Sequence, residues 1–200
     1  DSDKENPQPL FELAKLEILT GKFPQAITHL QLAKSIDANI SFIVLLAEAF
    51  QQNNQFEQAL EQLDLALILQ SDDSVLHLKK GILLGQLEQH LLAKESLEQS
   101  LKLNPNNLRT LVHLSRIDVI EQQPEKAIAK INKKIVELTE PNSFLLIELG
   151  NIHRLTNNNN EALSAYKKAY SVDNTNPNAL INIIEIQVML GQLKEAITLT

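Results

Sequence analysis

Arginine is the residue type whose placement in this sequence most clearly suggests binding chemistry. The 200-residue chain has three arginines, Arg109 and Arg116 in the stretch LRTLVHLSRIDVI (108–120) and Arg154 in NIHRL (151–155), whereas its lysines are scattered. A guanidinium presents a planar fork of N–H donors that matches the two oxygens of a carboxylate. The cluster therefore indicates recognition of acidic groups, within a chain whose own formal net charge is −7.

The residue types that usually carry catalysis do not form a recognisable constellation. The sequence has no cysteine, so it offers no thiol nucleophile, no disulfide framework and no zinc site built on thiolates. Its five histidines show neither the H-x-x-x-H nor the H-E-x-x-H spacing of metal sites. Ser164 and Lys167 match the Ser-x-x-Lys pattern of some hydrolases, but no second motif accompanies them. We therefore predict no enzyme, no catalytic residue, no metal site and no cofactor.

Charge and hydropathy bound the kinds of partner. The net charge of −7 and a pI of about 5.3 argue against nucleic acid, because phosphate contacts need a concentrated basic face. The longest apolar stretch, FIVLLA at 42–47, is too short to span a bilayer, and no signal peptide is visible. These features predict a soluble chain without membrane insertion. They do not choose between the cytoplasm and an exported location.

The elements that position the arginines follow a regular repeat. Good helix formers dominate and glycine occurs only five times, which predicts an all-α protein. Six alanines at spacings of 33, 34, 34, 35 and 34 residues each open an apolar helical segment: Ala26, Ala59, Ala93, Ala127, Ala162 and Ala196. Thirteen residues before each alanine except Ala93, where the residue is Lys80, lies a leucine or isoleucine, mostly followed by a small residue such as Ala47 or Gly150. Each unit is thus predicted to be two antiparallel helices that cross closely at small residues.

This periodicity resembles the tetratricopeptide repeat (TPR) family. The resemblance rests on the leucine–small pairs, the six alanines, a second small residue further along the second helix (Ala33, Ala66, Ser100, Ala169), and Pro105 at a repeat boundary. It covers residues 7–200 and implies a right-handed α-solenoid of tandem helix-turn-helix units. After a flexible polar tail at 1–6, the units are expected at 7–39, 40–73, 74–107, 108–142, 143–176 and 177–200. We expect the last unit to be incomplete and the natural chain to continue, because Ile197 and Leu199 would otherwise lack neighbours.

The resemblance also implies where a binding groove lies. In the family the inward side of the first helix is formed by residues near the second, fifth, ninth and twelfth places of each repeat. All three arginines fall on such places in neighbouring repeats. The predicted peptide-binding residues are Arg109, Val112, His113, Arg116, Phe144, Ile147, Asn151 and Arg154. Apolar side chains are expected to line the rest of the groove: Phe11, Val44, Val75, Leu78, Ile82, Val119, Ile181 and Val188.

The sequence leaves two interpretations of the arginines open. In the first, they bind an acidic peptide or protein in the groove of a non-enzymatic scaffold for protein–protein interaction. In the second, Arg116 and Arg154 pair with Glu148 or Asp118 and hold neighbouring helices in register. At the level of the whole protein, two alternatives to a scaffold remain. One is the TPR region of a larger enzyme, such as a transferase with its catalytic domain elsewhere. The other is a self-assembly module that forms a homo-oligomer.

Overall fold

The predicted all-α repeat is confirmed in the described part of the chain. The computed structural model describes residues 6–197, apart from the side chains of Glu195 and Ile197, and this part contains twelve helices and no strand. Residues 1–5 of the predicted tail, Leu199 and the side chain of Ile197 lie outside the description. The chain divides into two compact units, residues 1–106 and 107–200, which we call the N-terminal unit and the C-terminal unit.

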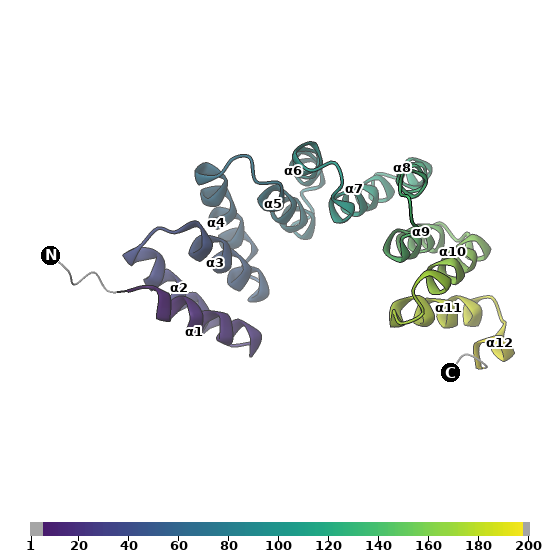
Figure 1. Ribbon diagram of the computed structural model, residues 1–200, viewed down its shortest axis with the longest axis horizontal. Coiled ribbons are helices and arrows are strands. Elements are labelled where there is room, and N and C mark those ends of the chain that lie inside the picture. The colour runs from purple at the N-terminus through teal and green to yellow at the C-terminus, as the bar shows by residue number, and fades with distance from the viewer. Residues whose placement is uncertain (1–5, 198–200) are drawn as a thin grey trace. The chain divides into compact units, whose positions relative to one another are not determined.

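The N-terminal unit contains three helical hairpins. Its helices are α1 (Gln8–Leu19), α2 (Phe23–Ile36), α3 (Ile40–Gln52), α4 (Phe56–Leu69), α5 (Ser74–Gln86) and α6 (His90–Leu103). Figure 1 shows how α1 folds back on α2, α3 on α4 and α5 on α6. Each hairpin also packs on the next one, through α2 against α3 and α4 against α5.

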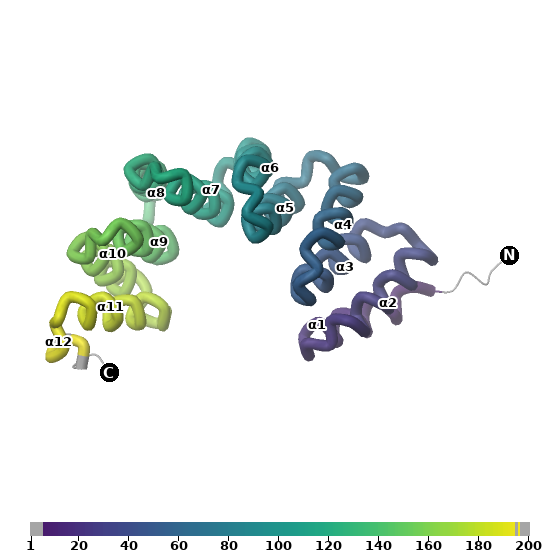
Figure 2. The backbone as a smooth tube through the Cα atoms, turned by 180° about the vertical axis from the view of Figure 1, so that it is seen from behind, coloured from purple at the N-terminus to yellow at the C-terminus, as the bar shows by residue number. Residues whose placement is uncertain are grey.

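The C-terminal unit repeats this arrangement. Its helices are α7 (Leu108–Ile120), α8 (Pro124–Glu137), α9 (Ser143–Leu155), α10 (Asn159–Val172), α11 (Pro177–Met189) and the short α12 (Leu193–Ile197). Figure 2 shows the pairs α7 and α8, α9 and α10, and α11 and α12 from the opposite side. In addition, α9 contacts the first helices of both neighbouring hairpins, α7 and α11. Residues on α7, α9 and α11 can therefore form one surface.

Local chemistry explains where the first helix of a hairpin begins. The residue before α3, α5, α7, α9 and α11 is an asparagine or aspartate whose side-chain oxygen accepts backbone N–H groups of the first helical turn: Asn39, Asp73, Asn107, Asn142 and Asn176. These side chains satisfy donors that have no partner within the helix. The caps fix the start of these five helices, and with it which residues fall on their inward sides.

The turn inside each hairpin contains one residue in the left-handed region of φ. These residues are Gly21, Asn54, Glu88, Gln122, Asn157 and Gly191, with φ between 59° and 74°. Each lies five residues before one of the six periodic alanines. Only two of the six are glycine, the residue that adopts this conformation without steric cost. The left-handed turn residue therefore recurs with the same period as the alanines.

The two helices of a hairpin approach closely at small residues. Ala26, Ala59, Ala93, Ala127 and Ala162 are fully buried, as the predicted helix crossing requires. On the partner helices, a Cβ atom added at Gly81 would come within 3.1 Å of the Ala93 carbonyl oxygen and 2.6 Å of the Leu97 side chain. At Gly150 it would come within 2.4 Å of the Tyr166 ring. There is no space for a larger residue at either crossing.

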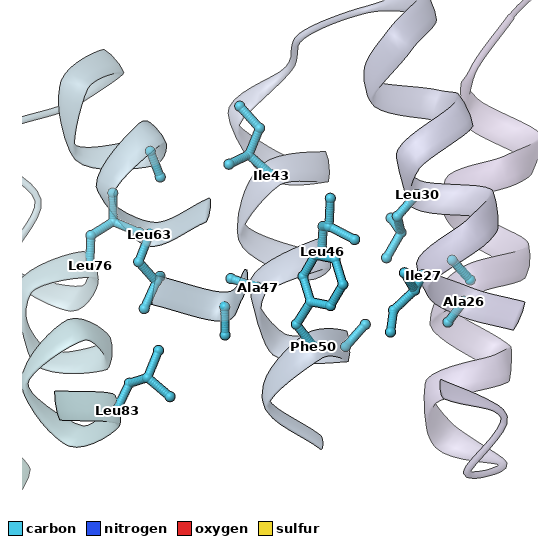
Figure 3. Packing of buried hydrophobic residues seen from close by; sticks show 14 residues of the cluster. Ala26, Ile27, Leu30, Ile43, Leu46, Ala47, Phe50, Leu63, Leu76 and Leu83 are labelled. Atoms are coloured by element: carbon cyan, nitrogen blue, oxygen red, sulfur yellow. The ribbon is translucent and has the colours of Figure 1, made fainter. Parts of the chain in front are cut away.

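Apolar side chains fill the space around these crossings. In the N-terminal unit, Figure 3 shows Ile27 and Leu30 of α2 facing Leu46 and Phe50 of α3. The cluster continues through Leu63 of α4 to Leu76 and Leu83 of α5. No single hairpin buries these faces alone, so the hairpins stabilise one another by removing apolar surface from water.

A buried charge also fastens the α7–α8 hairpin. The Asp118 side chain is completely buried, and its two oxygens lie 3.0 Å from Lys126 Nζ and 2.5 Å from Lys130 Nζ. Both lysines belong to α8, whereas Asp118 belongs to α7. The two ammonium groups offset the free-energy cost of burying the carboxylate. An unpaired carboxylate would be too costly to bury there.

The crossing at Gly150 leads to a stability prediction. Gly150→Ala should lower the free energy of unfolding by about 1–3 kcal/mol, because the new methyl group overlaps a fully buried ring. Gly85→Ala is the matched control, since a Cβ there meets nothing within 4 Å. That change should instead stabilise α5 by about 0.5 kcal/mol through helix propensity. Urea unfolding followed by circular dichroism measures both, and equal effects would refute the steric explanation.

The left-handed turn residues lead to a second prediction. Gln122→Gly should raise the free energy of unfolding by about 0.5–1 kcal/mol, because relief of the positive φ outweighs the added freedom of the unfolded chain. Gln123→Gly, one residue further on at φ −118°, relieves nothing and should be neutral or destabilising. Thermal melts compare the two variants, and a gain at Gln123 equal to that at Gln122 would contradict the argument.

Candidate functional site

Most of the predicted site residues meet at one surface of the C-terminal unit. Four of the eight lie on α7 (Arg109, Val112, His113, Arg116) and four on α9 (Phe144, Ile147, Asn151, Arg154). Five of them line a single cavity of about 390 Å³, together with Glu148 and three asparagines: Arg116, Phe144, Ile147, Asn151 and Arg154. Arg116, Asn151 and Arg154 also border a second cavity of about 340 Å³ beside Val119 and Leu155. We call this region the arginine surface.

Arg116 is committed to a partner within the protein. Its Nε and one terminal nitrogen donate to the two carboxylate oxygens of Glu148, each at 2.7 Å. The Glu148 side chain is only 4% exposed, whereas that of Arg116 is 50% exposed. The forked contact raises the pKa of Arg116 above its ordinary value. Arg116 therefore neutralises a buried carboxylate and links α7 to α9, as the second interpretation of the arginines expects.

Asn151 is held at both ends of its amide. Its Nδ2 donates to Glu148 Oε2 at 3.2 Å, and its Oδ1 accepts a hydrogen bond from the Tyr166 hydroxyl at 2.9 Å. Tyr166 lies on α10 and is fully buried, and burial raises the pKa of its hydroxyl. The hydrogen-bond network from Arg116 through Glu148 and Asn151 to Tyr166 joins three helices. These side chains therefore hold the surface in place, and their polar groups are largely occupied by one another.

Arg154 has a weaker internal contact. One of its terminal nitrogens lies 3.3 Å from Glu185 Oε2 on α11, and the two side chains are 38% and 51% exposed. Arg154 lines both cavities. Arg116 and Arg154 are thus both paired with glutamates. Asp118, the other partner considered for them, contacts the lysines of α8 instead.

Arg109 is the arginine without an internal partner among the described residues. It is exposed near the start of α7, where its backbone N–H is capped by Asn107. His113 lies one turn further along the helix. The pKa of His113 is lowered to about 4, mainly by burial and further by the positive charges of Arg116 and Arg109. The negative charge of Glu148 raises this pKa and offsets part of the effect. The imidazole is therefore neutral at neutral pH, and the positive charge of this surface comes from the guanidinium groups.

Two of the predicted groove residues are wrong. Val112 is only 1% exposed and Leu78 only 6%, so both belong to the hydrophobic core and present no surface to a ligand. Helical periodicity places every third or fourth residue on the same side of a helix. It does not tell which of these residues are exposed and which are buried against a neighbouring helix. Phe144, by contrast, is 43% exposed.

The predicted apolar positions in the N-terminal unit line a cavity of their own. Phe11, Val44 and Val75 border a space of about 390 Å³ within α1, α3 and α5. Lys15 and Lys79 lie at its rim, but Lys79 pairs with Glu48 and Lys15 with Glu12. This cavity is mainly apolar and has no arginine, so its chemistry differs from that of the arginine surface.

Sequence reasoning placed Ile181 and Val188 of α11 in the groove but missed the polar side chains of this helix and its cap. Asn176, Asn178 and Asn182 line the larger cavity of the arginine surface, and Glu185 pairs with Arg154. Asn178 and Glu185 occupy the second and ninth places of the last repeat, counted from Pro177. The rule that selected Arg109 and Arg116 in their repeat would have found both of them. Asn182 follows no such rule and is identified only by its position in the structure.

Within residues 6–197 there is no group of three or more His, Asp or Glu side chains arranged to hold a metal ion. Over the same range, none of the helices combines the length and the apolar character needed to cross a membrane.

The low pKa of His113 leads to a pH prediction. Between the ordinary pKa of 6.5 and about 4, the unfolded chain binds a proton that the native imidazole does not, so stability falls as the pH is lowered through this range. We expect wild type to lose about 1 kcal/mol more than His113→Gln between pH 7 and pH 4, after allowance for partial solvent screening. Urea unfolding at a series of pH values tests this. Parallel pH profiles would contradict it.

Comparison with known proteins agrees with the helix pattern. Two segments match the tetratricopeptide repeat family, residues 76–107 and residues 155–200. The first covers most of α5 and all of α6, and the second runs from the end of α9 through α12. No curated protein sequence matches the chain.

Solved structures with the same fold include several repeat proteins. A tetratricopeptide repeat protein from Parabacteroides merdae has a TM-score of 0.83 at 18% identity, covering 98% of this chain and 76% of that one. PilF of Pseudomonas aeruginosa has a TM-score of 0.72 at 19% identity, covering 98% and 89%. YrrB, described as a TPR protein with an unusual peptide-binding site, has a TM-score of 0.62 at 19% identity, covering 89% and 92%. The period of the sequence, the helical hairpins of residues 6–197 and these matches agree: the chain carries tetratricopeptide repeats at residues 76–107 and 155–200 and has the tetratricopeptide repeat fold.

Proposed function

We propose that this protein is a non-enzymatic scaffold that binds an acidic peptide, or an acidic segment of a partner protein, at the arginine surface. The TPR fold supports a role in protein–protein interaction, and YrrB is a protein of this fold described as having a peptide-binding site. The observation that carries the proposal is that a cavity of about 390 Å³ is lined by two arginines and two apolar residues, Phe144 and Ile147.

The three arginines have different roles in this proposal. Arg116 is a positioning residue, because its forked contact with buried Glu148 leaves little capacity for a ligand. Arg109 and Arg154 are the ligand-contacting residues. Arg109 has no internal partner among the described residues, and Arg154, which also interacts with the Tyr166 hydroxyl, has a single 3.3 Å contact with a carboxylate. The partner's carboxylates bind to these two guanidinium groups, and an apolar side chain packs against Phe144 and Ile147.

Charge supports an acidic partner over a neutral one. The cavity of about 390 Å³ is lined by Arg116, Arg154 and one carboxylate, that of Glu148, which Arg116 neutralises. The second guanidinium, that of Arg154, is only partly neutralised by its single 3.3 Å contact with Glu185, in a chain whose formal net charge is −7. Opposite charge steers encounter and favours the matching partner, although each contact adds only modest affinity at an exposed site.

Binding to peptide arrays tests this proposal. Short arrayed peptides that contain Asp or Glu should bind the wild-type chain better than the same peptides with Asn or Gln. Arg109→Gln combined with Arg154→Gln should weaken binding about tenfold or more, because each change removes hydrogen bonds between charged groups. Fluorescence anisotropy with the best peptide gives the affinities, and thermal melts should show that folding is retained.

The control matches the loss of charge at a distant site. Lys167→Gln combined with Lys168→Gln removes two exposed positive charges from α10, which lines neither cavity of the arginine surface. This variant should bind as the wild type does. Equal weakening in both double variants would reduce the effect to general electrostatics, and the absence of a preference for acidic peptides would overturn the proposal.

A further inference from the structure

Two ion pairs on the arginine surface differ in how firmly they are held. Arg116 and Glu148 share two contacts of 2.7 Å around a carboxylate that is 4% exposed. Arg154 and Glu185 share one contact of 3.3 Å between side chains that are 38% and 51% exposed. An exposed pair with a single long contact contributes little stability and exchanges readily with other partners. Arg154 can therefore leave Glu185, whereas Arg116 is bound to Glu148.

The position of Glu185 relates this exchange to binding. Glu185 approaches Arg154 from α11, while Arg154 lines both cavities. Only one terminal nitrogen of Arg154 contacts Glu185, and a guanidinium has five N–H donors. A carboxylate that enters either cavity meets a guanidinium that is already partly neutralised, and it competes with Glu185 for the same positive charge.

We infer that Glu185 is an internal competitor that sets the affinity and selectivity of the arginine surface for acidic partners. This inference rests on the proposed function and names the residue that regulates it. While Glu185 occupies Arg154, a weakly acidic or neutral segment gains little from the site. A partner whose carboxylate reaches the remaining N–H donors displaces Glu185 and is bound. Selectivity then arises from an internal carboxylate that disfavours the wrong partner, as well as from attraction to the right one.

Competition of this kind has a bounded size. Exposed ion pairs are weak, so removing the competitor should strengthen binding by roughly two- to fivefold. Because Glu185 is half exposed, Glu185→Gln should keep the fold and the melting temperature. Glu161→Gln is the matched control, since Glu161 is an exposed carboxylate on α10 and its replacement changes the net charge by the same amount.

Nuclear magnetic resonance of the arginine side chains tests the inference directly. The chain has three arginines, so its Nε–Hε spectrum should contain three signals, which single Arg→Lys variants assign. The probe is the acetylated, amidated tripeptide Glu-Leu-Glu, with Gln-Leu-Gln as its uncharged counterpart. On titration with Glu-Leu-Glu, the Arg154 signal should move and the Arg116 signal should stay. In Glu185→Gln the midpoint of the Arg154 titration should fall roughly two- to fivefold. In Glu161→Gln it should not change.

The outcomes separate the inference from the function on which it rests. If Arg154 responds to Glu-Leu-Glu with the same midpoint in wild type and Glu185→Gln, the competitor role is overturned and the acidic-peptide site stands. A midpoint that falls equally in Glu161→Gln also overturns it, because net charge then explains the gain. If neither protein responds, or if Gln-Leu-Gln acts as Glu-Leu-Glu does, the proposed function fails and the inference fails with it.

Discussion

The close approach of two helices within each hairpin is the constraint on which the rest of the structure depends. Ala93 faces Gly81 and Tyr166 covers Gly150, so the backbones come together where one partner lacks a side chain. A larger residue at either glycine would separate the helices and open voids along their length. Because neighbouring hairpins within a unit pack on one another, an error at one crossing would displace the apolar faces of the adjacent hairpin.

The arginine surface combines this scaffold with buried charge. Glu148 lies on α9 close to Gly150 and is almost completely buried, which is tolerable because Arg116 and Asn151 neutralise and hydrogen-bond it. Tyr166 then serves two purposes, since its ring fills the space beside Gly150 and its hydroxyl holds Asn151. The same side chains that close the core thus orient the edge of the cavity. The proposed binding surface is thus held by several short contacts around Glu148 and by one longer contact where Arg154 meets α11.

The candidate site could be predicted from the sequence only in part. Family spacing selected residues on α7 and α9, and five of the eight residues line one cavity. It failed for Val112, because a place on the inward side of a helix is open or buried according to the size of the neighbouring helix's side chains. It also stopped short of Asn178 and Glu185, although their places in the last repeat follow the same rule.

The amino-acid sequence by itself determined the helices, their pairing and the repeat, because helix propensity, apolar periodicity and small residues at fixed spacing act locally or between adjacent elements. Only the tertiary structure decided what each arginine does. Arg116 and Arg154 are equivalent in type and both fall on inward places, but one meets a buried carboxylate 32 residues away and the other an exposed one 31 residues away. The strength of an ion pair depends on the burial of both partners, and burial is a property of the packed helices that no single segment carries.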